Sequence, residues 1–280
     1  MTKNISLTKP LTKSSDHSTK KIFGTGEWAS SNLTFISGCQ HDCLYCYAKA
    51  MAIRFKKKTS SNWKNENIRI NDFQRKINKR KGRIFFPSSH DITPQHLDYS
   101  IQFLSKILTA GNDVLIVSKP HLECIKKICD QFPQFKSNIL FRFTIGSTNS
   151  ETLKFWEPNA PDFNERLESL KYAYNNGYQT SVSCEPMLDN NVEDLIEKTI
   201  EYVTNSIWLG KANRLKSILG MNGHLDEITI KKADELISLA DDSRIRDLYA
   251  RYMDNPKIKW KESIKKVIGI PLLEEKGLDI

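Results

Sequence analysis

The 280-residue sequence lacks the features that would place it in a membrane. No stretch approaches the roughly 18 consecutive apolar residues that a membrane-spanning helix needs. The first twenty residues are rich in Lys, Ser and Thr but have no apolar block, so they are not typical of a secretory signal. We therefore expect no contact with a membrane, and we expect residues 1–22 to form a flexible N-terminal arm.

Cysteine is scarce, and its distribution excludes a disulfide-stabilised secreted domain. Of the six cysteines, three fall within residues 39–46, and the others are Cys124, Cys129 and Cys184. Internal repeats and low-complexity segments are also missing from the sequence. With 39% hydrophobic and 10% aromatic residues, the chain has the composition of a soluble globular protein of one or two domains.

The three clustered thiols belong to Cys39, Cys43 and Cys46, at C-x3-C-x2-C spacing after an apolar segment, 32–37, that predicts a strand. Three thiolates on one loop can converge on one metal centre. A cubane iron–sulfur cluster normally takes four protein ligands, so three would leave one iron with the open position that a catalytic metal centre needs. A zinc loop is the alternative. Zinc would want a fourth Cys or His at short spacing, and only His41 is near.

Short apolar segments alternate with segments of helical periodicity over most of the chain. Strands are predicted at 32–37, 83–87, 113–117, 138–145, 179–183 and 206–209, and helices at 48–57, 94–110, 122–132, 162–176 and 192–203. Such alternation requires parallel strands joined by right-handed crossovers. Six units are too few for a closed eight-fold barrel. The sequence therefore favours an α/β fold with a partial (β/α)6 TIM-like barrel over 23–215, and a doubly wound flat sheet is the alternative.

Two segments do not follow this alternation. Residues 58–82 are polar and basic, and we expect an irregular insertion with one short helix there. Beyond Gly210, helices are predicted at 226–239, 244–253 and 261–268. We therefore expect residues 216–280 to form a C-terminal helical extension packed on the sheet.

Polar residues follow each predicted strand, and in parallel α/β folds the carboxyl ends of the strands carry the reacting groups. These residues are Ser88, Ser89, His90 and Asp91, then Lys119, then Arg142 and Thr144, then Cys184 and Glu185, and finally Lys211. Together they predict a polar pocket mouth with the cysteine loop at one side.

Each of these groups also has a purely structural alternative. Ser88, Ser89 or Asp91 could cap the helix that begins at Pro94. Glu185 could pair with Lys211, and Cys184 could be only a small core residue.

The net charge of +9 is concentrated in 54–58 and 75–83, with Trp63 between them. Basic segments with a nearby aromatic ring can hold phosphates and stack a base. A solvated basic face that only aids solubility is the alternative. The pattern makes nucleic acid a candidate partner.

The stretch Gly-Cys-Gln-His-Asp-Cys-Leu-Tyr-Cys-Tyr-Ala, residues 38–48, resembles the cluster motif of the radical S-adenosylmethionine (SAM) enzymes and, more narrowly, of their spore photoproduct lyase-like branch. Short segments at 147–153, 157–161, 165–170, 185–188 and 208–211 are also similar to that branch. The resemblance therefore covers roughly 32–213. It implies an enzyme whose cluster cleaves SAM to a 5′-deoxyadenosyl radical, which abstracts hydrogen from a substrate. It also implies a reducing, cytoplasmic location and a flavodoxin- or ferredoxin-like electron donor.

The resemblance implies particular roles, position by position. Cys39, Cys43 and Cys46 would ligate a [4Fe-4S] cluster. For SAM, it implies the adenine beside Tyr45, the amino group near Ser88 or Ser89, the carboxylate at Lys119 and the ribose at Thr144. Cys184 and Glu185 are the candidate catalytic residues, with Cys184 as a hydrogen donor.

One departure from the branch leaves the substrate open. The lyases carry a hydrogen-donating cysteine by the second strand, where this chain has Ser88 and Ser89. The basic segments favour nucleic acid or a nucleotide as substrate. The alternatives are a radical SAM reaction on a small metabolite or peptide, and a non-catalytic module that binds zinc or nucleic acid.

Overall fold

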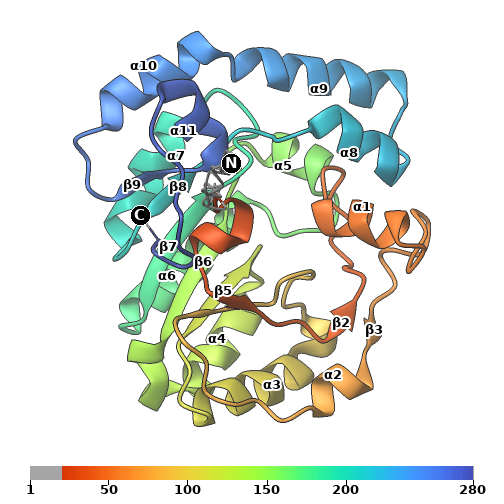
Figure 1. Cartoon of the computed structure of the whole chain (residues 1–280), viewed down its shortest axis with the longest axis vertical. Helices are drawn as coiled ribbons and strands as arrows, with labels where there is room; N and C mark the ends of the chain where they lie inside the picture. The colour runs from red at the N-terminus through yellow and green to blue at the C-terminus, as the bar shows by residue number, and fades with distance from the viewer. Residues whose placement is uncertain (1–20, 280) are drawn as a thin grey trace, which may run out of the picture.

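A parallel seven-stranded sheet forms the centre of the molecule (Figure 1). The computed structural model describes residues 21–279, so nearly all of the expected N-terminal arm lies outside the described residues. The strands lie in the order β1 (Ser31–Asn32), β4 (Ile84–Phe86), β5 (Val114–Ser118), β6 (Ile139–Thr144), β7 (Gln179–Cys184), β8 (Ile207–Leu209) and β9 (Ile258–Trp260). Every neighbouring pair is parallel. The expected α/β class with a mainly parallel sheet is confirmed.

Helices connect these strands, as the hydrophobic periodicity predicts for all of them except the one at 150–156, where no helix is predicted. The connecting helices are α1 (Tyr47–Arg54), α3 (Leu97–Thr109), α4 (Leu122–Gln131), α5 (Ser150–Trp156), α6 (Phe163–Asn175) and α7 (Val192–Thr199). Short 3-10 turns lie at η1 (Gly24–Glu27), η2 (Pro94–His96), η3 (Pro133–Asn138) and η4 (Ile200–Tyr202). None of the helices in the part of the chain that the structure describes is long and apolar enough to cross a membrane.

The two faces of the sheet pack against different cores. In β6, Phe141 and Phe143 face the large core beneath the helices, and Leu140 faces a smaller core around Trp28 and Trp208. Arg142 is fully buried and its guanidinium carbon lies 4.9 Å from the ring centroid of Trp28. Because successive strand residues point to opposite faces, the same alternation decides which strand-end residues can meet.

The basic segment folds back onto the start of the chain. The expected strand at 32–37 is two short strands: β1 belongs to the main sheet, and β2 (Ile36–Ser37) pairs antiparallel with β3 (Asn67–Ile68). A short helix, α2 (Ile70–Gln74), follows β3. The segment 58–82 therefore contains the one expected short helix and also a strand that ties it to the cysteine loop.

The C-terminal extension differs from the expected purely helical form. It contains α8 (Leu215–Asn222), α9 (Glu227–Leu239), α10 (Asp242–Tyr252) and α11 (Glu262–Ile268), but also β9, which pairs with β8. Ile258 and Trp260 are buried and Lys259 between them is half-buried, so β9 has the period of a strand. Three residues are too few for this period to be recognised in the sequence.

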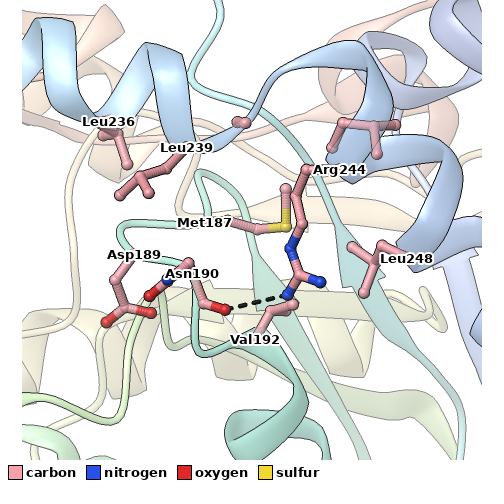
Figure 2. Close-up of a pocket in the computed structure, with 10 residues that line it drawn as sticks. Met187, Asp189, Asn190, Val192, Leu236, Leu239, Arg244 and Leu248 are labelled. Atoms are coloured by element: carbon pink, nitrogen blue, oxygen red, sulfur yellow. Dashed lines mark hydrogen bonds between the residues drawn. The ribbon is translucent and has the colours of Figure 1, made fainter.

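Arg244 in α10 holds the extension against the loop after β7 (Figure 2). It donates to the carbonyl oxygen of Asn190 at 3.1 Å and to both carboxylate oxygens of Glu193 at 2.7 and 2.6 Å. The cavity beside it, lined by Met187 and Leu236 among others, is about 10 Å³, enough for roughly one water molecule. The extension is therefore packed onto the sheet without a ligand-sized gap at this place.

We expect Ile258→Ala to lower the free energy of unfolding by about 2–5 kcal/mol, because it removes a buried side chain from a strand of the sheet. Ile228→Ala is the control, since Ile228 lies in α9 of the same extension but is 67% exposed; its effect should stay within about 0.5 kcal/mol. Urea unfolding measures both. Equal, small effects would mean that β9 is not part of the folded sheet.

Candidate metal centre

The cysteine loop begins at a glycine that no other residue could replace without moving the chain. Gly38 has a φ of +100°, and a Cβ there would lie 2.6 Å from the carbonyl oxygen of Trp63. The same carbonyl accepts the N–H of Cys39 at 3.1 Å. The loop is thus pressed directly against the basic segment, and only glycine permits this approach.

The three thiols of the loop lie together in a site that disfavours free thiolates. Cys39 and Cys43 are buried and Cys46 is half-buried. Burial raises the pKa of all three thiols, and the pKa of Cys39 is raised further by Asp91, Cys43 and Cys46. Cys46 caps α1, where its Sγ accepts the N–H of Lys49 at 3.3 Å. A bound cation would reverse this preference, because metal ions bind the thiolate form.

A second group of possible metal ligands includes Cys39. Two ligands of one ion with bonds of about 2.3 Å cannot lie more than roughly 4.6 Å apart. Within residues 21–279, the metal-ligating group whose atoms all lie within 4.8 Å of one another is Cys39, His41 and Asp91, not the three cysteines. Cys39 belongs both to this group and to the three thiols of the loop, and one sulfur bound to each of three irons would be the pattern of a cluster.

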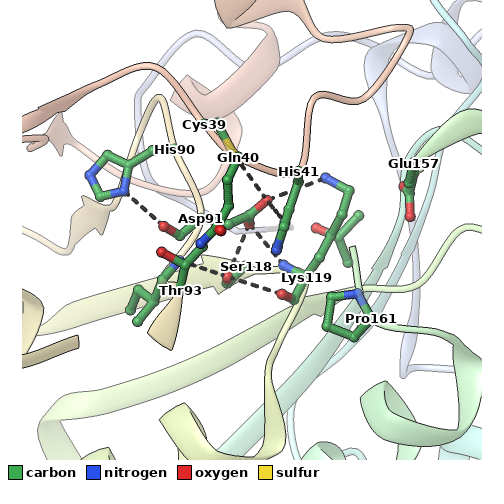
Figure 3. A network of polar contacts seen from close by, with 12 residues as sticks. Cys39, Gln40, His41, His90, Asp91, Thr93, Ser118, Lys119, Glu157 and Pro161 are labelled. Carbon is green, nitrogen blue, oxygen red and sulfur yellow. Dashed lines mark hydrogen bonds and ion pairs between the residues drawn. The ribbon is translucent and has the colours of Figure 1, made fainter. Parts of the chain in front are cut away.

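Asp91 fixes the cysteine loop to the ends of β4 and β5 (Figure 3). Its Oδ2 lies 2.7 Å from Nδ1 of His41, and its Oδ1 accepts bonds from the Ser118 hydroxyl at 3.0 Å and from the Lys119 N–H at 2.9 Å. Burial opposes ionisation of Asp91, but Lys119 and His41 lower its pKa well below the usual range. The Lys119 ammonium is 3.7 Å away. A buried carboxylate thus links three segments.

Both ring nitrogens of His41 are engaged, since Nδ1 faces Asp91 and Nε2 lies 2.9 Å from Nε2 of His121.

The helix-capping alternative for the residues after β4 is not observed. The N-cap of η2 is Thr93 without a side-chain bond, and Ser89 instead bonds the Thr34 hydroxyl at 2.8 Å.

A second buried ion pair holds the loop from the other side. Arg166 and Glu157 are both fully buried, with Nη2 2.5 Å from Oε2. The Tyr45 hydroxyl donates to the other oxygen of Glu157, and Arg166 donates to the carbonyl of Thr144 at 3.1 Å. Burial, followed by the charge of Glu157, raises the pKa of Tyr45 well above its usual value. Glu157 and Arg166 lie within segments of the resemblance, which implies no site role for them.

Four consecutive strands place the other expected residues at one edge of the sheet. The registers Phe86↔Ile116, Ser118↔Phe143 and Thr144↔Ser183 bring the ends of β4 to β7 side by side. Ser88, Ser89, Lys119, Thr144 and Glu185 follow or end these strands and are all half-buried. Lys119 also lies 5.9 Å from the ring centroid of Tyr45. The structure thus brings Tyr45 and Lys119 together beside the cysteine loop.

Cys184 and Glu185 point to different sides of the sheet. Cys184 is fully buried in the core beneath the helices, with its Sγ 3.7 Å from the carbonyl of Gly146. Glu185 is on the other side, near Lys261 rather than the expected Lys211, which pairs with Asp242. Cys184 therefore matches its structural alternative and is not grouped with the strand-end residues.

The surroundings of Glu185 favour its protonated form. Burial raises its pKa to about 7, and the Lys261 ammonium, 3.6 Å away, only partly opposes this. Such a carboxyl can exchange a proton near neutral pH, as a general acid or base does.

Most charged side chains of the basic segment are exposed, whereas its tryptophan is buried. Trp63 is only 2% exposed, so the expected stacking of a base on its ring is wrong. Exposed rings near the segment are Tyr47 and Phe55 in and after α1.

No known family profile matches the chain. An uncharacterised protein of Acidianus two-tailed virus is 26% identical over 213 residues, which cover 71% of this chain and 70% of that protein. An uncharacterised protein of Methanocaldococcus jannaschii is 28% identical over 169 residues, covering 59% of this chain and 61% of that protein.

A solved structure shares the fold. Streptococcus suis SuiB, in a crystal structure bound to S-adenosylmethionine, superposes with a TM-score of 0.52 and 11% identity. The match covers 89% of this chain and 54% of SuiB, so the chain spans about half the length of that protein. The likeness establishes a common α/β fold.

We expect the stability of the protein to fall between pH 4.5 and about 7 because of Glu185. Its pKa is higher in the folded state, so its stabilising contribution is complete below the ordinary pKa and is lost as pH rises through the folded value. Relative to Glu185→Gln, the wild type should lose about 2–3 kcal/mol between about pH 5 and about pH 8. Urea unfolding at both pH values measures this.

The control for Glu185 is Glu168→Gln, since the Glu168 side chain is 56% exposed in its pair with Lys171. Its pH profile should run parallel to that of the wild type. A parallel profile for Glu185→Gln as well would contradict the raised pKa.

Proposed function

We propose that this chain is a radical SAM enzyme that holds a [4Fe-4S] cluster on Cys39, Cys43 and Cys46. The observation that carries the proposal is the set of three thiols on one loop that lie close enough together for Cys43 and Cys46 to raise the pKa of Cys39. The shared fold with SuiB, whose structure contains bound SAM, supports the same proposal. When bound, the cluster and SAM would supply a 5′-deoxyadenosyl radical that abstracts hydrogen from a substrate.

The residues at the strand ends would bind and orient SAM. Lys119 is charged and held by Asp91, so its ammonium can form a charge-assisted bond to the SAM carboxylate. Thr144 at the end of β6 would meet the ribose, Tyr45 the adenine, and Ser88 or Ser89 the amino group. Glu185 stays a candidate catalytic residue for moving a proton, whereas Cys184 is not proposed as the hydrogen donor.

The sheet is proposed to curve into a partial barrel. A doubly wound sheet reverses its strand order at a switch point. Here the order follows the chain from β1 to β9 without a reversal, as in a barrel. Membership of the lyase-like branch is proposed from the similar sequence segments alone. The cytoplasmic location and the flavodoxin- or ferredoxin-like electron donor stay predictions.

A second candidate is a single-ion site, favoured by the close approach of Cys39, His41 and Asp91. It would leave Cys43 and Cys46 without a role. Both ring nitrogens of His41 are also already bonded, to Asp91 and to His121. The cluster uses all three thiols and leaves those bonds intact, so it fits better.

Anaerobic reconstitution followed by a SAM-cleavage assay tests the proposal. The wild type should bind about four iron and four sulfide per chain and form 5′-deoxyadenosine with dithionite. Alanine at any of Cys39, Cys43 or Cys46 should reduce both to background, because each removes one ligand. Cys124→Ala is the control, since Cys124 is a buried thiol in α4 away from the loop. Full cluster content in the Cys43 variant would refute the assignment.

Lys119→Ala should keep its cluster but bind SAM about 10- to 100-fold more weakly, the effect of losing a hydrogen bond to a charged group. Equilibrium dialysis with labelled SAM measures the affinity. Lys127→Ala, at an exposed position in α4, should bind SAM like the wild type. Unchanged affinity for the Lys119 variant would remove that residue from the site.

We also propose nucleic acid, or a molecule like a nucleotide, as the substrate class. Residues 54–83 contain twelve Lys and Arg against two acidic residues, a net charge of +10 where the whole chain has +9. Outside this segment the charges nearly cancel. The segment also touches the cysteine loop at Gly38 and Cys39. A polyanion bound there would lie beside the metal centre.

The salt dependence of oligonucleotide binding tests this substrate class. Replacing the exposed Lys56 and Lys57 by Ala should reduce the slope of log affinity against log salt by about 2, since each phosphate contact contributes about 1. The exposed pair Lys231 and Lys232 in α9 is the control. Equal slopes for both double variants, or no binding, would favour a small metabolite or peptide substrate.

A further inference from the structure

The C-terminal extension touches the cysteine loop through one fully buried side chain. Asn222 is the last residue of α8, and its Nδ2 donates to the carbonyl oxygens of Leu44 at 2.9 Å and Cys46 at 3.1 Å. Figure 1 shows α8 beside α1, the helix that begins directly after Cys46. Two carbonyls of the loop are therefore bonded by a residue that is more than 170 positions away in the sequence.

The two carbonyls differ in what else bonds them: that of Cys46 also accepts the Ala50 N–H at 3.1 Å at the start of α1, whereas the bond that the structure gives to that of Leu44 comes from Asn222. The loop is not in a sheet ladder, and Asp42 within it has a left-handed φ of +46°. A buried carbonyl left without a hydrogen bond is destabilising. By bonding both carbonyls, Asn222 fixes the Leu44–Tyr45 and Cys46–Tyr47 peptide units, and with the second of these the backbone from which the Cys46 side chain begins.

Neighbouring contacts hold Asn222 itself in place. The backbone carbonyl oxygen of Asn222 accepts a hydrogen bond from the Ser60 hydroxyl of the basic segment. Gly223 then ends α8 with a left-handed φ of +85°, which turns His224 toward Lys49, 3.5 Å away. Lys49 in turn pairs with Asp42 of the loop at 2.7 Å. Residues 222–224 thus contact the loop, α1 and the basic segment at once.

We propose that Asn222 is a positioning residue of the metal centre, and that the C-terminal extension is required to hold the cysteine loop in its cluster-binding form. The inference rests on the proposed function for its cluster readout. Asn222 supplies no ligand to the site; it acts through the backbone carbonyls of Leu44 and Cys46. The extension is therefore a structural part of the site.

Asn222→Asp tests this role with little change of shape. It replaces a donor by a carboxylate that faces two carbonyl oxygens. The matched control is Asn112→Asp, because Asn112 is equally buried and its Nδ2 also donates to two carbonyls, of Asn78 at 3.3 Å and Ile107 at 3.0 Å. That pair of bonds lies after α3, away from the cysteine loop.

Two readouts separate a positioning role from a general loss of stability. In the protein before reconstitution, amide hydrogen exchange over residues 43–47 should be about 10-fold or more faster in Asn222→Asp than in Asn112→Asp. After reconstitution, Asn222→Asp should show less iron per chain and an altered electron paramagnetic resonance signal, while Asn112→Asp keeps the wild-type signal.

The inference would be overturned if Asn222→Asp showed the wild-type rate of amide hydrogen exchange over residues 43–47 together with the wild-type electron paramagnetic resonance signal. If the wild type itself takes up no cluster, the proposed function fails, but the exchange rates still decide the role of Asn222. Faster exchange confined to residues 43–47 would then support it, and exchange equal to that of Asn112→Asp would refute it.

Discussion

The buried carboxylate of Asp91 is the interaction on which the geometry of the metal centre depends. It follows β4, accepts hydrogen bonds from Ser118 and Lys119 at the end of β5, and lies 2.7 Å from His41 in the cysteine loop. Because the group is buried, each partner that it loses is costly, and its bonds to His41, Ser118 and the Lys119 N–H together hold it in place. Its negative charge also keeps the Lys119 ammonium beside the loop. One carboxylate therefore sets both the position of the thiols and the charge next to them.

Three separate parts of the fold hold the loop. Asp91 acts from the second and third strands of the sheet, the Glu157–Arg166 pair from the segments after β6, and Asn222 from the C-terminal extension. A loop that is proposed to hold a cluster would benefit from such outer contacts, because they orient the ligands before binding. The basic segment adds a fourth contact through Trp63. The site is thus assembled from the whole chain and not from its motif alone.

The sequence predicted what local patterns encode. The cysteine spacing, the amphipathic helices such as α3 and the polar strand ends needed only short windows of residues, and the parallel α/β sheet followed from their alternation. The contacts of Asp91, Glu157 and Asn222 could not be predicted, because each depends on a partner far away in the sequence. The same holds for β9, which is too short to show a period, and for Trp63, whose burial depends on packing. Cys184 shows the limit of strand-end reasoning, since one step along a strand moves a side chain to the other face.

The most direct test is an anaerobic crystal structure of the reconstituted protein with SAM, with iron located by its anomalous scattering. Our account predicts a four-iron cluster bonded to the sulfurs of Cys39, Cys43 and Cys46, with the amino and carboxylate groups of SAM on the fourth iron. A single tetrahedral ion bonded to Cys39, His41 and Asp91 would contradict it.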